Sequence, residues 1–92
     1  MLSDKQRLFI ARHLLCGVPG LEEKMVSQSK GTLWPDAIEW LNSGEPTPEQ
    51  RIIGLIALDV WNCSGKTVIG EAISKLDHKT LKRITDVLQA LI

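Results

Sequence analysis

One long apolar segment, with a strong helix-start signal in front of it, most constrains the fold of this chain. Residues 52–61 are apolar apart from Gly54 and Asp59. They follow a threonine suited to an N-cap, a proline at the first helical position and a glutamine three residues after the cap, in Thr47, Pro48 and Gln50. A helix that is apolar on nearly every face is one that other helices surround. We therefore predict that about 48–62 forms the central helix of an all-α fold.

Gly54 is unusual inside this predicted helix. Glycine costs about 1 kcal/mol relative to alanine in a helix interior. We expect that cost to be offset by the close approach of another backbone at this position.

Other helices are predicted from apolar residues that recur at three- and four-residue steps, because the strict alternation typical of strands is almost absent. The expected ranges are 4–16, 19–30, 32–44, 66–76 and 78–91, with Ser3, Pro19, Pro35 and Asp77 near their starts. The whole chain, 1–92, is expected to be one domain, a single compact bundle of about five to six short helices.

The helical periods also predict which side chains face the core. We expect Ile69, Ala72, Ile73 and Leu76 to face inward together. The two cysteines are too few for a disulfide scaffold, so they are predicted to pack as small core residues. The remaining expected core residues include Trp34, Trp61, Cys16, Cys63 and, as a widening of the first helical stripe, Phe9.

Composition excludes several classes of function. Eleven basic and eleven acidic residues give a formal net charge of zero, so the chain lacks an overall basic footprint for nucleic acid or anionic membranes. The longest apolar run, 52–61, is about half of what a membrane-spanning helix needs. Without an export signal near residue 1, we expect a cytoplasmic location.

The segment that follows the central helix, Ser64 to Thr67, has the letters that end a phosphate-binding loop. Such a loop needs a glycine five positions before its Gly-Lys pair, between a strand and a helix. Counting back from Gly65 gives Val60, inside a helical pattern. We interpret the segment as a helix end followed by the start of the next helix, and we expect no nucleotide or other cofactor.

Two further candidate sites are weak. His13 and Cys16 share a helix face, but Cys16 lies at the helix C-terminus, where the dipole opposes thiolate formation. A zinc site from His13, Cys16, Cys63 and His78 lacks the usual close ligand pairs. We therefore expect neither an enzyme nor a metal protein.

Asp59, the acid in the apolar segment, needs a partner if it is buried. We expect it to face the surface, or to pair with Arg51 or Lys66.

The first functional hypothesis is a non-enzymatic interaction or regulatory module that binds a protein partner or a second copy of itself. Trp40 lies off the main inward stripe of its predicted helix, beside Glu39 and Asn42. Tryptophan side chains at a surface often carry much of the energy of an interface. The apolar stripe of 78–91 could also contribute to a dimer.

The second hypothesis is a DNA-binding regulator. The segments 66–76 and 78–91 resemble a helix-turn-helix DNA reader, with basic residues on the second helix. This resemblance implies phosphate contacts from His78, Lys79, Lys82 and Arg83. The other interpretation, which we favour, is that these residues form the solvated outer face of an amphipathic helix.

Overall fold

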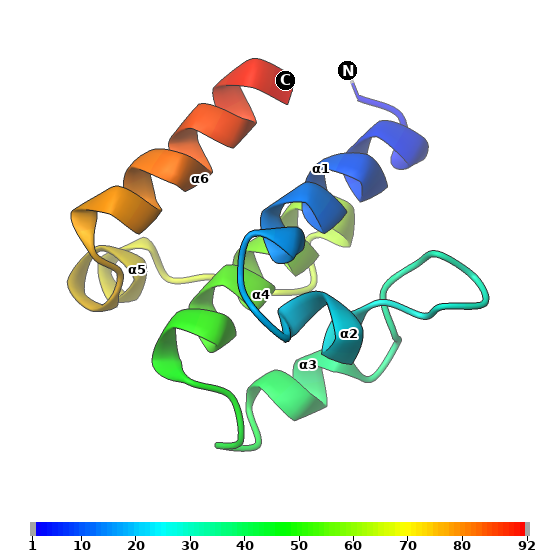
Figure 1. Cartoon of the computed structure of the whole chain (residues 1–92), viewed down its shortest axis with the longest axis horizontal. Helices are drawn as coiled ribbons and strands as arrows, with labels where there is room; N and C mark the ends of the chain where they lie inside the picture. The colour runs from blue at the N-terminus through cyan, green and yellow to red at the C-terminus, as the bar shows by residue number, and fades with distance from the viewer. Residues whose placement is uncertain (1, 92) are drawn as a thin grey trace.

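The central helix predicted from the apolar segment is present as α4, Pro48–Asn62, in the computed structural model, which describes residues 2–91 (Figure 1). Its start is fixed by a complete capping box. The Thr47 hydroxyl accepts a hydrogen bond from the Gln50 amide at 3.1 Å, and the Gln50 side chain accepts one from the Thr47 amide at 2.9 Å. The helix ends where Cys63 adopts a left-handed conformation with φ +64°.

Five more helices complete the described part of the chain, and the all-α prediction is confirmed. They are α1, Asp4–Cys16; α2, Leu21–Met25; α3, Ala37–Leu41; α5, Ile69–Lys75; and α6, His78–Leu91. Helices make up 66% of the described residues, which contain no strand beyond an isolated bridge between Val26 and Leu33.

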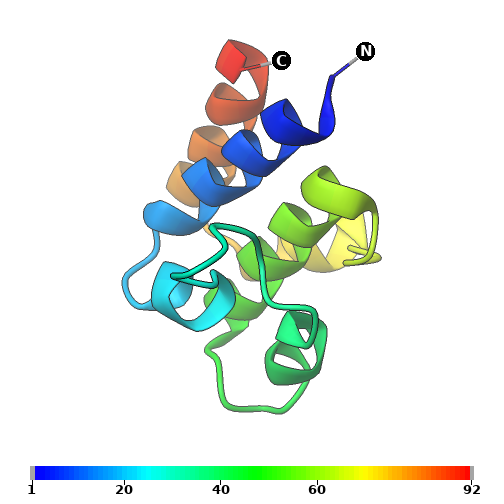
Figure 2. The same ribbon diagram turned by 90° about the vertical axis from the view of Figure 1, so that its right-hand side faces the viewer.

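The core lies between α1 and α4, which pack side by side (Figures 1 and 2). The α4 helix also packs against α2, α3 and α5, while α6 lies beside α1 and runs antiparallel to it (Figures 1 and 2). Fully buried aliphatic side chains fill the junction between α1 and α4, among them Leu14, Leu15, Ile52 and Ile53. Burial of such side chains contributes about 1.5–3 kcal/mol each to folding.

The helices α2 and α3 are much shorter than the predicted ranges 19–30 and 32–44. Between them the chain makes a narrow turn, in which the Ser27 amide donates to the Thr32 oxygen at 2.7 Å. Gly31 permits the turn because it adopts φ +72°. The flanking residues Val26 and Leu33 are buried. They lie on extended backbone and not in a helix.

The prediction for 66–76 is wrong in its start and in half of its inward face. Lys66 adopts φ +53°, which is incompatible with a helix, so α5 begins at Ile69. Ala72 and Leu76 are buried as predicted, but Ile69 and Ile73 are 74% and 62% exposed. Because α5 has only seven residues, it packs against the bundle along one edge only.

Gly54 does not meet another backbone, which corrects the expectation for this position. A Cβ there would lie 2.6 Å from Leu41 Cδ2 and 3.0 Å from Met25 Sδ, so two buried side chains fill its space. The close backbone approach occurs at Gly65 instead, where a Cβ would collide with the carbonyl group of Leu55.

Several residues predicted in the core lie at the surface. Cys16 and Cys63 are exposed, each at the end of a helix. Trp34 is 43% exposed, because α3 begins only at Ala37 and leaves residue 34 in the preceding loop. Phe9 is 60% exposed, since α1 buries the opposite face through Ile10 and its neighbours. Trp61 is half-buried and packs against the core.

Candidate functional site

The loop from Ser64 to Thr67 binds an anion that belongs to the chain itself. Asp59 Oδ1 accepts a hydrogen bond from the Lys66 amide at 2.7 Å, and Asp59 Oδ2 accepts one from the Thr67 amide at 2.8 Å. Consecutive amides of this kind are what a phosphate-binding loop offers to a nucleotide. In this protein a carboxylate from α4 already occupies them, which supports the interpretation of the segment as a connection between helices.

Asp59 is ionised more readily than an ordinary aspartate. Burial opposes its charged form, but interactions with the Thr67 side chain and amide, and with the amides of Lys66 and Gly65, outweigh burial and lower the pKa of Asp59. The partners are thus mostly backbone groups of the loop. Within the part of the chain that the structure describes, Asp59 makes no ion pair within 4.0 Å with Arg51 or Lys66.

The two cysteine thiols contact a backbone oxygen and a guanidinium group. The Cys16 thiol donates a hydrogen bond to the backbone oxygen of His13 at 3.1 Å, not to the imidazole. Cys63 Sγ lies 3.3 Å from Nη2 of Arg7. Among residues 2–91, no group of three or more His, Cys, Asp or Glu side chains lies close enough to hold a metal ion.

Two of the three predicted partner-binding residues share one surface. Trp40 is half-buried against the core, and its indole Nε1 donates to Glu45 Oε2 at 2.7 Å. Trp40 and Glu39 line a hollow of about 560 Å³ together with Trp34, whose indole was expected in the core. The hollow therefore has an aromatic wall that the sequence indicated only in part.

Asn42, the third predicted residue, lies on another side of α3. Its side-chain oxygen accepts hydrogen bonds from Nε and Nη2 of Arg51 at 3.3 and 3.2 Å. Nη1 of the same guanidinium forms an ion pair with Glu71 of α5. These side chains line a hollow of about 470 Å³, which Val68 also borders.

The basic residues predicted for DNA contact do not form one outward row. His78 and Lys79 are exposed, and Lys82 is exposed but paired with Asp86 at 2.8 Å. Arg83 faces α1 instead of solvent, which corrects its place on the outer face. Its Nη2 donates to the backbone oxygens of His13 and Leu14, both at 3.1 Å.

An apolar cluster on α5 was missed by the sequence reasoning. Val68, Ile69 and Ile73 are all more than 60% exposed at the start and along one face of this helix. The helical spacing predicted Ile69 and Ile73 on the inward face. The local pattern does not distinguish them from Ala72 and Leu76, which are buried.

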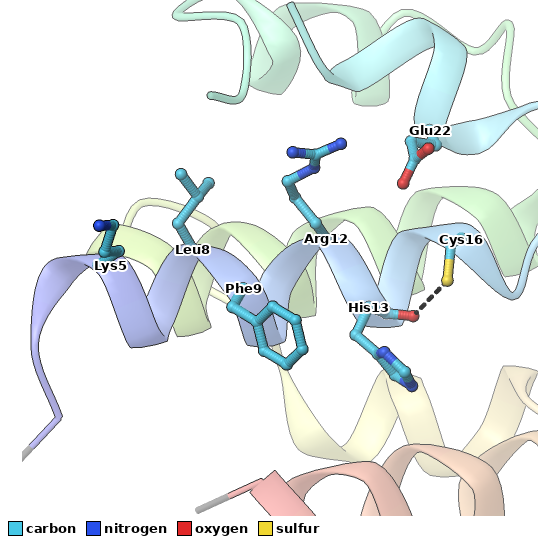
Figure 3. A pocket seen from close by; sticks show the side chains of 7 residues that line it. All are labelled: Lys5, Leu8, Phe9, Arg12, His13, Cys16 and Glu22. Carbon is cyan, nitrogen blue, oxygen red and sulfur yellow. Dashed lines mark hydrogen bonds between the residues drawn. The ribbon is translucent and has the colours of Figure 1, made fainter. Parts of the chain in front are cut away.

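A groove runs along α1, on the side away from α4 (Figure 3). It measures about 370 Å³. Lys5, Leu8 and Arg12 project on the side of α2, and Phe9 and His13 project on the side of α6 (Figure 3). We call this surface the α1 groove; Cys16 and Glu22 close its end.

Comparison with known proteins gives no relative: no protein-family model, curated protein or solved structure matches the chain. Among the described helices, none is long and apolar enough to cross a membrane.

Proposed function

We propose that this protein is a non-enzymatic module that acts by binding another protein or a second copy of itself. The observation that carries the proposal is the uncovered apolar face of α5, where Ile69 and Ile73 are 74% and 62% exposed one helical turn apart. Single exposed apolar residues are ordinary, but adjoining ones on one face are typical of contact surfaces.

The α3 helix extends this surface. Asn42, at the C-terminal end of α3, and Val68, just before α5, border the same hollow. On another side of α3, the two indoles of Trp34 and Trp40 line a separate hollow. We include both hollows and the exposed face of α5 in the proposed contact region, and we call it the α3–α5 surface, defined by Trp34, Glu39, Trp40, Asn42, Val68, Ile69 and Ile73.

The composition of the α3–α5 surface suits a protein partner. Apolar and aromatic side chains provide the area that is removed from water, and Glu39, Arg51 and Glu71 provide a charged rim. The proposal involves no cofactor. It includes the cytosolic location that we expect from the sequence.

DNA binding stays a prediction, and fewer residues than expected are placed to contact DNA. Because Arg83 is held by α1, phosphate contacts would rest on His78, Lys79 and Lys82. If the prediction is right, duplex DNA binds at low ionic strength, the affinity falls steeply with salt, and Lys79→Ala weakens it.

The test of the proposed function compares the wild-type chain with the double variant Ile69→Ser, Ile73→Ser. Size-exclusion chromatography with light scattering over a range of concentrations measures self-association, and cross-linked affinity capture measures a partner. We expect one dimer or one captured protein that the double variant loses. Thr85→Ala, an exposed change on α6, is the control. A monomer whose captured proteins are the same in both variants contradicts the proposal.

A further inference from the structure

Two cations on α1 have no acidic partner among residues 2–91. The ion pairs within residues 2–91 are Arg51 with Glu71 and Lys82 with Asp86, so neither Lys5 nor Arg12 has a carboxylate within 4.0 Å. Both side chains are exposed and both line the α1 groove. The charge of this groove is therefore available to a ligand.

The spacing of these cations matches a helix laid along α1. Lys5 and Arg12 are seven residues apart, which is about 10 Å along a helix. Leu8 lies between them on the same side of α1 (Figure 3). A partner helix with carboxylates seven residues apart and an apolar residue between them would meet all three side chains at once.

Phe9 supplies the apolar contact that a purely ionic site lacks. It is 60% exposed, and its ring centroid lies 6.1 Å from that of His13 on the second row of the groove. An aromatic ring of this kind adds a large area that a partner can remove from water.

We propose that the α1 groove binds an acidic amphipathic helix of a partner protein, with its carboxylates at Lys5 and Arg12 and its apolar side chains on Leu8 and Phe9. This inference rests on the proposed function and names the chemistry of one partner. It uses α1 and not the α3–α5 surface, so the two proposals can fail separately.

A helix is favoured over a nucleic-acid backbone by the mixture of side chains. Phosphates would gain from Lys5 and Arg12 but nothing from Phe9 and Leu8. An acidic helix uses both the charges and the apolar rows.

The probe is a fluorescent helical peptide about two heptads long, with glutamates seven residues apart and leucines between them. Binding is followed by fluorescence anisotropy at low ionic strength. We expect saturable binding that Phe9→Ser and Arg12→Glu each weaken about tenfold or more. Raising the salt to about 0.15 M should weaken it further. Both residues are exposed, and an unchanged unfolding curve verifies that each variant folds.

Matched controls change the same residue types elsewhere. Ile73→Ser and Lys75→Glu alter an exposed apolar residue and an exposed cation of α5, and both should bind the peptide as the wild type does. A peptide with lysine in place of glutamate should not bind. Loss of binding in the α5 controls would overturn the assignment to α1.

Three other outcomes would also overturn the proposal. In the first, the acidic peptide does not bind the wild-type chain. In the second, duplex DNA or anionic vesicles bind, and their binding depends on Phe9 and Arg12 in the same way. In the third, the chain dimerises and Phe9→Ser abolishes the dimer, in which case the groove takes a second copy. Failure of the peptide with an intact effect of Ile69→Ser, Ile73→Ser on the first test leaves the proposed function standing.

Discussion

The guanidinium group of Arg83 lies over Gly17, in the space that a side chain at position 17 would occupy. From there it donates to the backbone oxygens of His13 and Leu14 in the last turn of α1, where carbonyl groups lack a backbone amide partner within the helix. A cation at a helix C-terminus is also favoured by the helix dipole. Arg83 thus caps α1 from α6 and joins the first helix to the last.

This relationship predicts a coupled pair of substitutions. Gly17→Ala displaces the guanidinium, and Arg83→Met removes it while keeping most of the stem. Each should lower the free energy of unfolding by about 1 kcal/mol, because a charge-assisted hydrogen bond is lost at a partly exposed site. In urea unfolding, the double variant should resemble the single ones. Strictly additive losses would show that the two residues act independently.

The hydrogen bonds of Asp59 predict a pH dependence in acid. Since its pKa in the folded protein lies below the ordinary value, ionised Asp59 stabilises the fold above its unfolded pKa. That contribution is lost as the pH falls through the lowered folded pKa. Asp59→Asn should lower the free energy of unfolding by about 1 kcal/mol at neutral pH and flatten its decline in acid.

The control for this experiment is Asp86→Asn. Asp86 pairs with Lys82 on the exposed face of α6, where such pairs contribute little. If both variants show the same acid profile, the loop between α4 and α5 is not held by the Asp59 carboxylate.

Two glycines in helices should respond in opposite directions to the same change. Gly54→Ala brings a methyl group against Leu41 and Met25, both fully buried, and should destabilise the protein by about 1–3 kcal/mol. Gly70→Ala meets nothing within 4 Å and should stabilise it, by up to about 1 kcal/mol. Thermal unfolding of the two variants beside the wild type measures both. Stabilisation by Gly54→Ala would mean that the α3–α4 contact is loose.

Two isoleucines in neighbouring helices should differ sharply in how much they contribute to the free energy of unfolding. Ile84→Ala opens a cavity at a buried position of α6 and should cost about 2–4 kcal/mol. Ile73→Ala, on the exposed face of α5, should change the free energy of unfolding by less than about 0.5 kcal/mol. A large loss at Ile73 in chemical denaturation would show that its side chain serves the fold and not a contact surface.

The helices that could be predicted to the residue are those whose ends are fixed by side chains. Ser3 with Gln6, and Thr47 with Gln50, form capping boxes, and Asp77 accepts from the Thr80 amide at 2.7 Å. The helices α2, α3 and α5 have no side-chain cap, so turns and tertiary packing decided their ends. Such long-range terms are not visible in a local pattern.

The candidate site was predictable only in part for the same reason. Glu39 and Trp40 lie on one surface, as their proximity in sequence indicated, but Asn42 points elsewhere and Trp34 takes a place there. The uncovered face of α5 follows from the start of that helix at Ile69, which depends on the left-handed Lys66. Arg83 was misplaced because the pattern of α6 alone does not reveal the carbonyl groups of α1 beside it.

The way α6 is attached gives the molecule two levels of local stability. Of residues 78–91, all described, Ile84 is the one buried residue, whereas α4 has six buried residues between Ile52 and Leu58. Amide hydrogens of α6 should therefore exchange with solvent through a partial opening that leaves α1 and α4 paired. Those of α4 should exchange only on global unfolding. The last helix can thus open locally while the rest of the protein stays folded.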